Sequence, residues 1–498
     1  MTDILPIKRA LISVSDKTGL IEHARALSEL GAALVSTGGT KTAIAGAGLK
    51  VEDVSAVTGF PEMMDGRVKT LHPKVHGGLL AMRGNPEHQA ALLAHDIAPI
   101  DLLVGNLYPF RETLARGAGF DEVIENIDIG GPAMLRSAAK NHQSVTVVVD
   151  PADYPEVARQ IQANGQTTLD FRQQLAAKVF ARTAAYDAAI AQYLKGAFTL
   201  ADAAKEKTGA DSSRLPPSLQ VTASQVQPLR YGENPHQRAA LYGDFDEFYR
   251  QLHGKELSYN NILDLTAAAH LIGEFENDPP TAAILKHMNP CGVGQGQSLR
   301  EAWDKALATD KQAPFGGIIA VNKRLDGPCA EAISDLFSEV IVAPEFSPEA
   351  LQILQKKKNL RLLVLRRNPL TPFSFEIRSV GANSFLLQDR DLRSTQAADL
   401  RIVTQRAPSE AELRAMLFGW RIVKHVKSNA IVYVAEGRTL GIGAGQMSRV
   451  DASRIAVWKA GQAGLSLRGS VVCSDAFFPF PDGLIAAAEA GATAAIQP

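Results

Sequence analysis

The chain has 498 residues, of which 46% are hydrophobic and 21% are charged, and its formal net charge at pH 7 is −1. Length and composition of this kind are typical of a soluble protein with two or three globular domains. The balanced charge favours neither nucleic acid nor an anionic membrane as a partner. We find no apolar run long enough to span a bilayer, and the N-terminus lacks the cationic start and apolar core of a signal peptide.

The three cysteines are Cys291, Cys329 and Cys473, which are far apart and form no CxxC pair. This spacing argues against a disulfide framework and against the common kinds of zinc site. We therefore expect a cytoplasmic protein without a catalytic metal.

The first 200 residues alternate strand and helix patterns. The apolar run RALISV precedes LIEHARALSELG, which has helical spacing, and AALVSTGG likewise precedes TKTAIAGAG. The segments DLLVGNLYPF and SVTVVVDPADYPEVARQI continue the alternation, with Asp150 expected as a helix N-cap and Pro151 as the first helical residue. The pattern predicts a doubly wound parallel sheet that binds ligands at the carboxyl ends of its strands.

Two turns of this sheet are candidate phosphate sites. SVSDKTGL (13–20) and STGGT (36–40) each place hydroxyl residues where a strand ends and a helix begins, and Lys17 adds a positive charge. Helix capping explains either turn alone, but two such turns at adjacent strand ends favour the phosphate of a mononucleotide. Neither turn has the GxxxxGK[ST] spacing of an ATP-binding P-loop.

The segment DGRVKTLHPKVHGG (65–78) is rich in cations and histidines. Arg67, Lys69, His72 and His76 are four potential donors, punctuated by Pro and Gly. They favour an ordered loop over an anion or a carbonyl group, and a solvated basic loop is the alternative.

A third candidate is NIDIGGPAMLRSAAKNH (126–142). Pro132 fits the first turn of a helix, which places Arg136 and Lys140 on one face, four residues apart. Like charges at that spacing repel unless a ligand, or Asp128 just before the helix, lies between them. A solvated helix face is the other interpretation.

The pattern breaks between about Ala204 and Gln227, where we place a domain boundary. The second half is again α/β, with NAIVYVAEGRTLGIG expected as a hairpin that turns at Glu436–Gly437. GIGAGQMSR (441–449) is not a dinucleotide fingerprint, because Gln446 stands where GxGxxG requires glycine.

The segment AILKHMNPCGVG (283–294) carries a lysine–histidine pair at the end of an expected strand. Each cation lowers the pKa of the other, which favours a neutral histidine base. Because adjacent strand residues point to opposite faces, both reach one pocket only if the chain turns, and we expect NPCGVG, with Pro290 and Gly292, to be that turn. Cys291 is expected to pack rather than to act as a nucleophile.

The motifs together resemble a known family. SVSDKTGL, STGGT, GRVKTLHPKVHGG, NLYPF, IDIGGPAMLRSAAKNH, LRYGENPHQ, LKHMNPCG, KHVKSNAIV, GIGAGQMSR and SDAFFPF occur in this order. Nearly the whole chain resembles the bifunctional purine-synthesis enzymes that are both AICAR transformylase and IMP cyclohydrolase. The resemblance implies a methylglyoxal-synthase-like cyclohydrolase domain (1–200), a linker (201–228) and a transformylase domain (229–498) of two cytidine-deaminase-like α/β halves.

For the cyclohydrolase domain, the resemblance implies dehydrative ring closure of FAICAR to IMP. Lys69, Tyr108, Asp128 and Lys140 would surround the reacting groups, with lysines polarising the formyl oxygen and Asp128 moving protons. The residues implied to bind the ribose phosphate and the adjoining substrate are Ser13, Ser15, Lys17, Ser36, Thr37, Gly38, Gly39, Thr40 and Arg67.

For the transformylase domain, the resemblance implies formyl transfer from 10-formyltetrahydrofolate to AICAR. His287 would be the base, Lys286 would stabilise charge or protonate the departing folate nitrogen, and Asn429 would orient the formyl oxygen. The residues implied to bind AICAR and folate are Arg230, Tyr231, His236, Asn261, Phe315, Gly316, Arg449, Phe477 and Asp482. Family members are homodimers that share their transformylase sites.

Two features depart from the family pattern. The family continues with a glycine-rich segment and a stretch ending near RHFRH, whereas this sequence ends at GATAAIQP, so we expect a transformylase domain without that tail. TDKQAPFGG (309–317) replaces the usual DPxSAFGG and places Ala313–Pro314 beside the expected folate loop, where we expect an altered affinity. A cyclohydrolase without transformylase activity and a nucleotide-binding module without catalysis are the alternatives.

Overall fold

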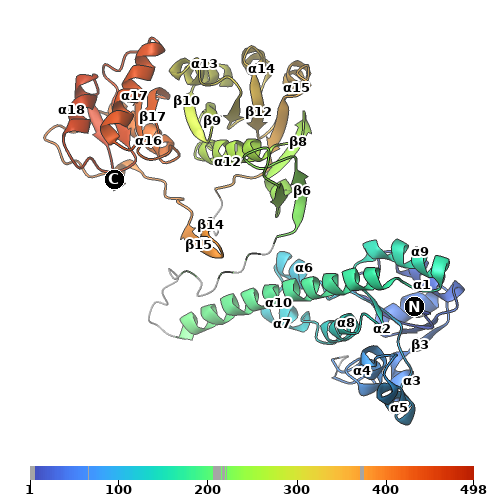
Figure 1. The fold of residues 1–498 in the computed structure, drawn as a ribbon. Coiled ribbons are helices and arrows are strands. Elements are labelled where there is room, and N and C mark those ends of the chain that lie inside the picture. Colours follow the sequence, from blue (N-terminus) through green and yellow to red (C-terminus); the bar gives the residue numbers. More distant parts are fainter. Residues whose placement is uncertain are drawn as a thin grey trace. The chain divides into compact units, whose positions relative to one another are not determined.

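The computed structural model describes residues 6–64, 67–205, 215, 219, 221, 223–370 and 375–498. Contacts along the chain define two compact units, Met1–Arg214 and Leu215–Pro498, whose elements are labelled in Figure 1. The expected linker, 201–228, falls partly outside the described residues. Within the described residues, no helix is both long enough and apolar enough to cross a membrane.

Five parallel strands form the centre of the first unit, in the order β3-β2-β1-β4-β5. They are β1 (Arg9–Ser13), β2 (Ala33–Ser36), β3 (Val51–Asp53), β4 (Leu102–Gly105) and β5 (Thr146–Val148). Side chains of β1 alternate between the two faces, so that Ala10 and Ile12 enter one core and Leu11 enters the other. The strand order reverses direction at β1, and a doubly wound sheet binds its ligands at that point.

Helices cover both faces of this sheet (Figure 1). One face carries α1 (Leu20–Glu29), α2 (Gly38–Gly46) and α9 (Tyr154–Asn164); the other carries α4 (Pro73–Leu80), α8 (Gly130–Lys140) and α10 (Leu169–Lys205). The shorter helices are α3 (Val54–Thr58), α5 (Pro86–Ala94), α6 (Phe110–Ala115) and α7 (Phe120–Glu125).

The expected cap at Asp150 and helical start at Pro151 are confirmed, although the first turn is a 3₁₀ turn. Asp150 is a cap, since its carboxylate accepts a hydrogen bond from the Ala152 N–H at 3.0 Å. It caps a single 3₁₀ turn, η2 (Pro151–Asp153), and the α-helix begins only at Tyr154.

The second unit is built on a ten-stranded mixed sheet in the order β19-β18-β16-β17-β10-β9-β11-β12-β13-β8. Its strands are β8 (Tyr249–His253), β9 (Thr281–Lys286), β10 (Asn289–Gln295), β11 (Gly317–Val321), β12 (Ser338–Ala343), β13 (Arg361–Leu365), β16 (Ile431–Ala435), β17 (Arg438–Gly443), β18 (Val471–Ser474) and β19 (Ala494–Ile496). Two separate hairpins pair β6 (Gln225–Leu229) with β7 (Ala239–Tyr242) and β14 (Phe375–Gly381) with β15 (Ser384–Asp389).

The sheet consists of two similar halves joined where β10 pairs with β17. In the first half the elements follow in the order helix, hairpin, helix, strand, helix, strand. The three helices of this order are α12 (Tyr259–Gly273), α13 (Leu299–Thr309) and α14 (Gly327–Ser334), and α15 (Pro348–Leu354) follows them. The second repeats this order with α16 (Glu410–Val423), α17 (Arg449–Gln462) and α18 (Asp482–Glu489). A short α11 (Phe245–Phe248) and the 3₁₀ turn η3 (Ala397–Asp399) complete the unit. The α/β fold expected for both parts of the chain is therefore present.

Both halves use glycine to bring a strand close to a helix. A Cβ on Gly441 or Gly443 would collide with the carbonyl oxygens of Ala456 or Ala452 in α17. The corresponding pairs in the first half are Gly292 with Ala306 and Gly294 with Ala302. The GIGAG motif thus serves strand–helix packing.

The turn expected at NPCGVG is wrong. The strand β9 ends at Lys286 and β10 begins at Asn289, so the turning residues are His287 and Met288. Pro290 and Gly292 lie inside β10, where the pairing register shifts between them. Gly292 is glycine because α13 lies against the strand. The other expected turn, the hairpin at Glu436–Gly437, is confirmed.

Candidate active sites

Two lysine ammonium groups converge on the turn between β2 and α2 in the first unit. A Cβ added to Gly38 would lie 2.8 Å from Nζ of Lys69, and one added to Gly39 would lie 4.0 Å from Nζ of Lys17. The N-terminus of α2 adds backbone N–H groups and a positive dipole end. The turn therefore combines three sources of positive potential suited to a phosphate group.

The hydroxyl groups of this turn divide into two roles. Ser36 and Thr40 donate hydrogen bonds to backbone carbonyls of the neighbouring β1 segment at 2.7 and 2.9 Å, which fixes the turn on the sheet. Thr37 forms no side-chain cap on α2, and its Oγ1 lies 3.5 Å from Oγ of Ser13. Simple helix capping therefore does not account for Thr37.

Asn106, which the sequence analysis missed, holds the other turn. Its Oδ1 accepts hydrogen bonds from the backbone N–H groups of Ser15 at 2.6 Å and Asp16 at 3.0 Å, and its Nδ2 donates to the carbonyl of Asp16 at 2.8 Å. Asn106 directly follows β4, the neighbour of β1. Its position after a strand of the sheet is the signal that points to it.

Lys69, Tyr108 and Asp128 come together beside the phosphate turn through Glu62. Lys69 forms an ion pair of 2.8 Å with Glu62. Burial raises the pKa of the Tyr108 phenol, and the negative charges of Asp128 and Glu62 raise it further. Burial also raises the pKa of Asp128, although hydrogen bonds from the backbone N–H groups of Gly131 and Tyr108 oppose the rise. The cluster thus offers a cation and a carboxyl group that holds its proton more readily than usual.

The other donors of the 65–78 loop do not gather at this site. Arg67 pairs with Glu125, His72 accepts the Lys74 N–H as the cap of α4, and Nδ1 of His76 lies 3.0 Å from Oγ of Ser137 in α8. Each histidine uses one ring nitrogen for a local partner, whereas Nε2 of His76 is buried without a hydrogen-bond partner in the described part of the chain. The expectation of four donors over one ligand therefore stays a prediction. Residues 65 and 66 of the motif lie outside the described residues.

Lys140 lies away from Asp128 within one chain. The eleven residues of α8 separate its two ends by about 15 Å, and Asp128 precedes the start of that helix. Lys140 instead lines an open cavity of about 610 Å³ with Arg136, His142 and Phe180 among its walls. Of the alternatives offered for this pair, Asp128 is excluded, because it precedes the first residue of α8. The Arg136 guanidinium lies 5.3 Å from the centre of the Phe180 ring.

In the second unit, Lys286, His287 and Asn289 line one cavity of about 280 Å³. The Nζ of Lys286 donates to the carbonyl of Phe315 at 2.7 Å, which attaches the Phe315–Gly316 loop to the end of β9. Cys291 also lines this cavity, and burial raises the pKa of its thiol to about 12. A thiol in that state is protonated at neutral pH and is a poor nucleophile.

The second half of the sheet brings Asn429 and Arg449 toward the hairpin formed by β9 and β10. The Lys427 N–H donates to Oδ1 of Asn289 at 2.9 Å, which ties the loop before Asn429 to β10. Nη2 of Arg449 lies 3.1 Å from Oδ1 of Asp475. Burial would raise the pKa of Asp475, but hydrogen bonds from Ser428, Ala430 and Arg449 outweigh it and lower the pKa. The sequence analysis missed Asp475, although it is the second residue of the SDAFFPF motif.

The remaining expected nucleotide ligands differ in availability. Arg230 lies over the ring of Tyr231, 4.8 Å from its centre, and His236 is exposed. Asn261 is only 9% exposed and forms a reciprocal capping box with Ser258 at the start of α12. This structural use of Asn261 argues against direct substrate contact by its side-chain oxygen.

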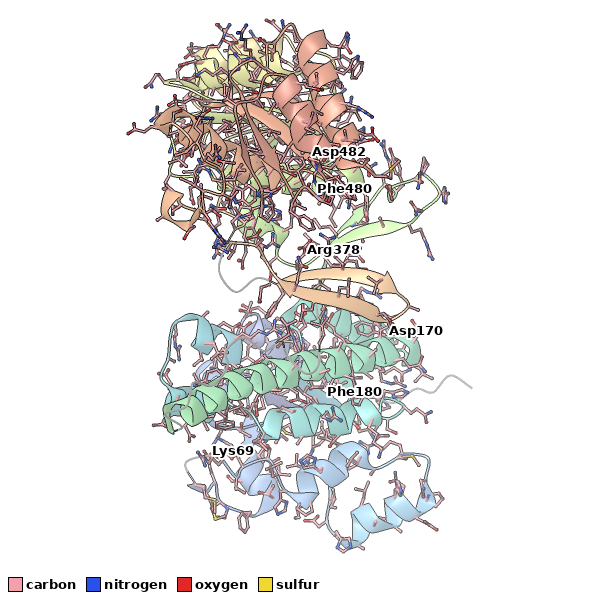
Figure 2. The ribbon with its side chains drawn as sticks, turned by 90° about the vertical axis from the view of Figure 1, so that its left-hand side faces the viewer. Lys69, Asp170, Phe180, Arg378, Phe480 and Asp482 are labelled. Carbon is pink, nitrogen blue, oxygen red and sulfur yellow. The ribbon has the colours of Figure 1, made fainter. Side chains whose placement is uncertain are left out.

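Exposed aromatic rings mark the expected folate side. Phe315 is 62% exposed and packs against Phe337 with ring centres 5.1 Å apart. Gly316 has a φ of 76°, which glycine adopts without strain. Phe477 is 61% exposed, and Asp482 begins α18, where Figure 2 labels it.

The described residues contain no group of three or more His, Cys, Asp or Glu side chains arranged to hold a metal ion. The first unit pairs a phosphate turn with a lysine–carboxyl cluster (Lys69 is labelled in Figure 2), and the second presents a lysine–histidine turn beside exposed aromatic rings. These features define a two-unit α/β enzyme with one candidate site in each unit.

Comparison with known proteins specifies the family. The sequence model of the AICARFT/IMPCHase bienzyme matches residues 138–459, and that of the MGS-like domain matches residues 19–133. The chain belongs to the AICARFT/IMPCHase bienzyme family. It is a bifunctional enzyme of purine biosynthesis with formyltransferase and IMP cyclohydrolase activities.

Its relatives match over almost their full length. The bifunctional purine biosynthesis protein PurH of Cereibacter sphaeroides is 54% identical and covers 100% of this chain and 94% of its own length. The proteins of the same name from Chloroflexus aurantiacus and Chlorobium chlorochromatii are 56% and 52% identical, and each alignment covers 99% of this chain and 93% of the relative.

Proposed function

We propose that the first unit closes the ring of FAICAR on the Lys17–Lys69 turn. The single observation that carries this assignment is the convergence of both ammonium groups on Gly38 and Gly39. Lys17, Thr37 and the α2 N-terminus would bind the ribose phosphate. Lys69 would stabilise negative charge on the formyl oxygen, and Asp128 and Tyr108 would move protons as the carboxamide nitrogen attacks and water leaves.

The test for this site is FAICAR turnover by Lys69→Ala. Loss of a preorganised positive charge is expected to lower kcat by about 10²-fold or more, whereas loss of a phosphate contact in Lys17→Ala is expected to raise KM more than it lowers kcat. Unchanged turnover in a Lys69→Ala plus Lys140→Ala double variant would instead favour a nucleotide-binding module without catalysis.

We propose that the second unit transfers the formyl group of 10-formyltetrahydrofolate to AICAR at the Lys286–His287 turn. His287 would take a proton from the weakly basic amine, and Lys286 would stabilise the oxyanion or protonate the departing folate nitrogen. Asn429 would orient the formyl oxygen, and Phe315 and Phe477 would contact the folate ring. Normal formyl transfer by His287→Ala would contradict the assignment of the base.

The same unit is proposed to work without a catalytic metal, because Lys286 supplies the positive charge that a formyl transfer needs. Treatment of the enzyme with a chelator, followed by removal of the chelator, is expected to leave formyl transfer unchanged. A loss of activity that one divalent cation restores would contradict this proposal.

We propose domains at residues 1–200 and 229–498, joined by a linker at 201–228. We also propose that the protein is a cytoplasmic homodimer that shares its transformylase sites and has no nucleic-acid or membrane partner. The position of Lys140 supports a second copy, because it lies at the opposite end of α8 from Asp128. In a dimer, Lys140 of one subunit would serve the cyclohydrolase site of its neighbour.

Subunit mixing tests this arrangement. Lys69→Ala and Lys140→Ala are each expected to be inactive in ring closure, but random exchange of their subunits should restore about one quarter of the wild-type activity, since half the dimers then hold one intact site. No recovery after exchange has been verified by mass would contradict the shared site.

A further inference from the structure

The turn that carries His287 has an unusual backbone. His287 and Met288 have φ angles of 53° and 64°. Residues with side chains rarely adopt this left-handed region, and it persists only where the surroundings hold it. The contacts that hold this turn therefore bear directly on where the His287 imidazole lies.

Asp264 makes the principal contact from outside the hairpin. Its Oδ1 accepts the backbone N–H of Met288 at 2.8 Å, and the N–H of His287 also donates toward its carboxylate. Asp264 lies in the middle of α12, where aspartate is an unfavourable choice for the helix itself. Its place is thus explained by the turn it contacts.

Asn289 anchors the turn from a second direction. Its Nδ2 donates to the carbonyl of His287 at 3.1 Å, while its Oδ1 accepts the Lys427 N–H from the other half of the sheet. Asp264 fixes the N–H groups of the turn and Asn289 fixes one of its carbonyls. Together they leave the backbone of His287 little freedom.

We propose that Asp264 is a positioning residue for formyl transfer, which holds the left-handed turn that directs His287 into the cavity beside Lys286. It acts through the backbone and does not touch the reacting atoms. This inference rests on the proposed role of His287 as the base.

The test compares Asp264→Ala with Asp264→Asn. Alanine is expected to lower kcat of formyl transfer about tenfold or more with KM for AICAR changed less than about twofold, because displacement of a reacting group by ~1 Å can cost about 100-fold. Asparagine is expected to keep kcat within about threefold, because its amide oxygen can still accept the Met288 N–H that Oδ1 of Asp264 accepts. Ring closure by the same preparations is expected to stay unchanged and reports on the first unit, while the thermal unfolding transition of the second unit, followed by circular dichroism, reports on folding around residue 264.

A second substitution separates turn conformation from other effects. Met288→Gly in the Asp264→Ala background is expected to recover kcat by about threefold or more, since glycine adopts a positive φ without strain. Amide hydrogen exchange of residues 281–295 is expected to accelerate in Asp264→Ala and not in Asp264→Asn, whatever His287 does chemically.

Three outcomes would overturn the proposal: normal kcat in Asp264→Ala, equal loss in Asp264→Asn and Asp264→Ala, or no recovery with Met288→Gly. Loss of the cooperative unfolding transition of the second unit in Asp264→Ala would also overturn it, because the substitution would then act on folding. His287→Ala in the same assay separates the assignment of His287 as the base from that of Asp264 as a positioning residue. Normal formyl transfer by His287→Ala would contradict the base assignment, and the hydrogen-exchange data would still test whether Asp264 holds the turn.

Discussion

The partly buried carboxyl group of Asp128 lowers the stability of the folded protein, although the proposed proton transfer requires it. Burial beside Tyr108 raises its pKa above that of an exposed aspartate. A raised pKa in the folded state means that folding disfavours the charged form of Asp128. The charged carboxylate therefore lowers the free energy of unfolding above the folded-state pKa, and this loss disappears as the pH falls toward the pKa of the unfolded state.

Replacing Asp128 with asparagine is therefore expected to raise the melting temperature at pH 7, and this gain is expected to shrink as the pH is lowered through the folded pKa. Ring closure is expected to fall by about 10²-fold, since proton transfer by a side chain contributes at least that much. Calorimetry at several pH values checks the stability change and FAICAR turnover checks the activity. A lower melting temperature at pH 7 would show that the N–H groups of Gly131 and Tyr108 favour the charged form more than burial opposes it.

The sequence indicates the types of residue at the sites better than their individual partners. Strand ends and glycine turns are local signals that led to Lys17 and Thr37, and the density of cations in the 65–78 segment led to Lys69. Asn106 and Asp264 each act on a turn more than twenty residues away in the chain. No local pattern contains such pairings, so only the fold reveals which turns these two residues hold.

Among the elements, the parallel sheet of the first unit follows directly from its alternating apolar runs and helices, and the structure confirms it. The β9–β10 hairpin does not follow, because glycine and proline at 290–292 suggest a turn. Gly292 is instead required by the close approach of α13. In the sequence, a glycine required for strand–helix packing therefore cannot be distinguished from a glycine required for a turn.

This packing role leads to a prediction for α17. Gly443→Ala would place a methyl group against the carbonyl of Ala452 and push α17, with Arg449 at its start, away from β17. Overpacking of this kind costs about 1–3 kcal/mol, and formyl transfer is expected to fall with it. Chemical denaturation and the transfer assay measure the two effects.

Gly461→Ala is the matched control in the same helix, because no atom lies within 4 Å of its added Cβ. It is expected to stabilise the protein by about 0.5–1 kcal/mol through helix propensity. Equal effects of the two substitutions would show that contact with Ala452 does not decide the cost at Gly443.

For the whole molecule, the hydrophobic clusters of described residues are confined to one unit or the other. Three belong to residues before Arg214 and three to residues after Leu215. A unit with its own core is expected to fold alone. The repeated order of elements in the second unit was not visible as a sequence repeat, because the two halves share their packing geometry and few residue identities.

The fragment Met1–Arg214 is accordingly expected to unfold cooperatively and to close the FAICAR ring at a rate comparable with the full chain, while it lacks formyl transfer. The phosphate turn, Lys69, Tyr108, Asp128 and Lys140 all lie within it. A dimer of the fragment, in which Lys140 of one copy serves the site of the other, therefore holds every proposed cyclohydrolase residue. Circular dichroism during thermal unfolding and FAICAR turnover are the measurements. A folded fragment that light scattering shows to be dimeric but that lacks ring closure would mean that a residue after Leu215 completes the cyclohydrolase site, and the assignment of that site to the first unit alone would then be wrong.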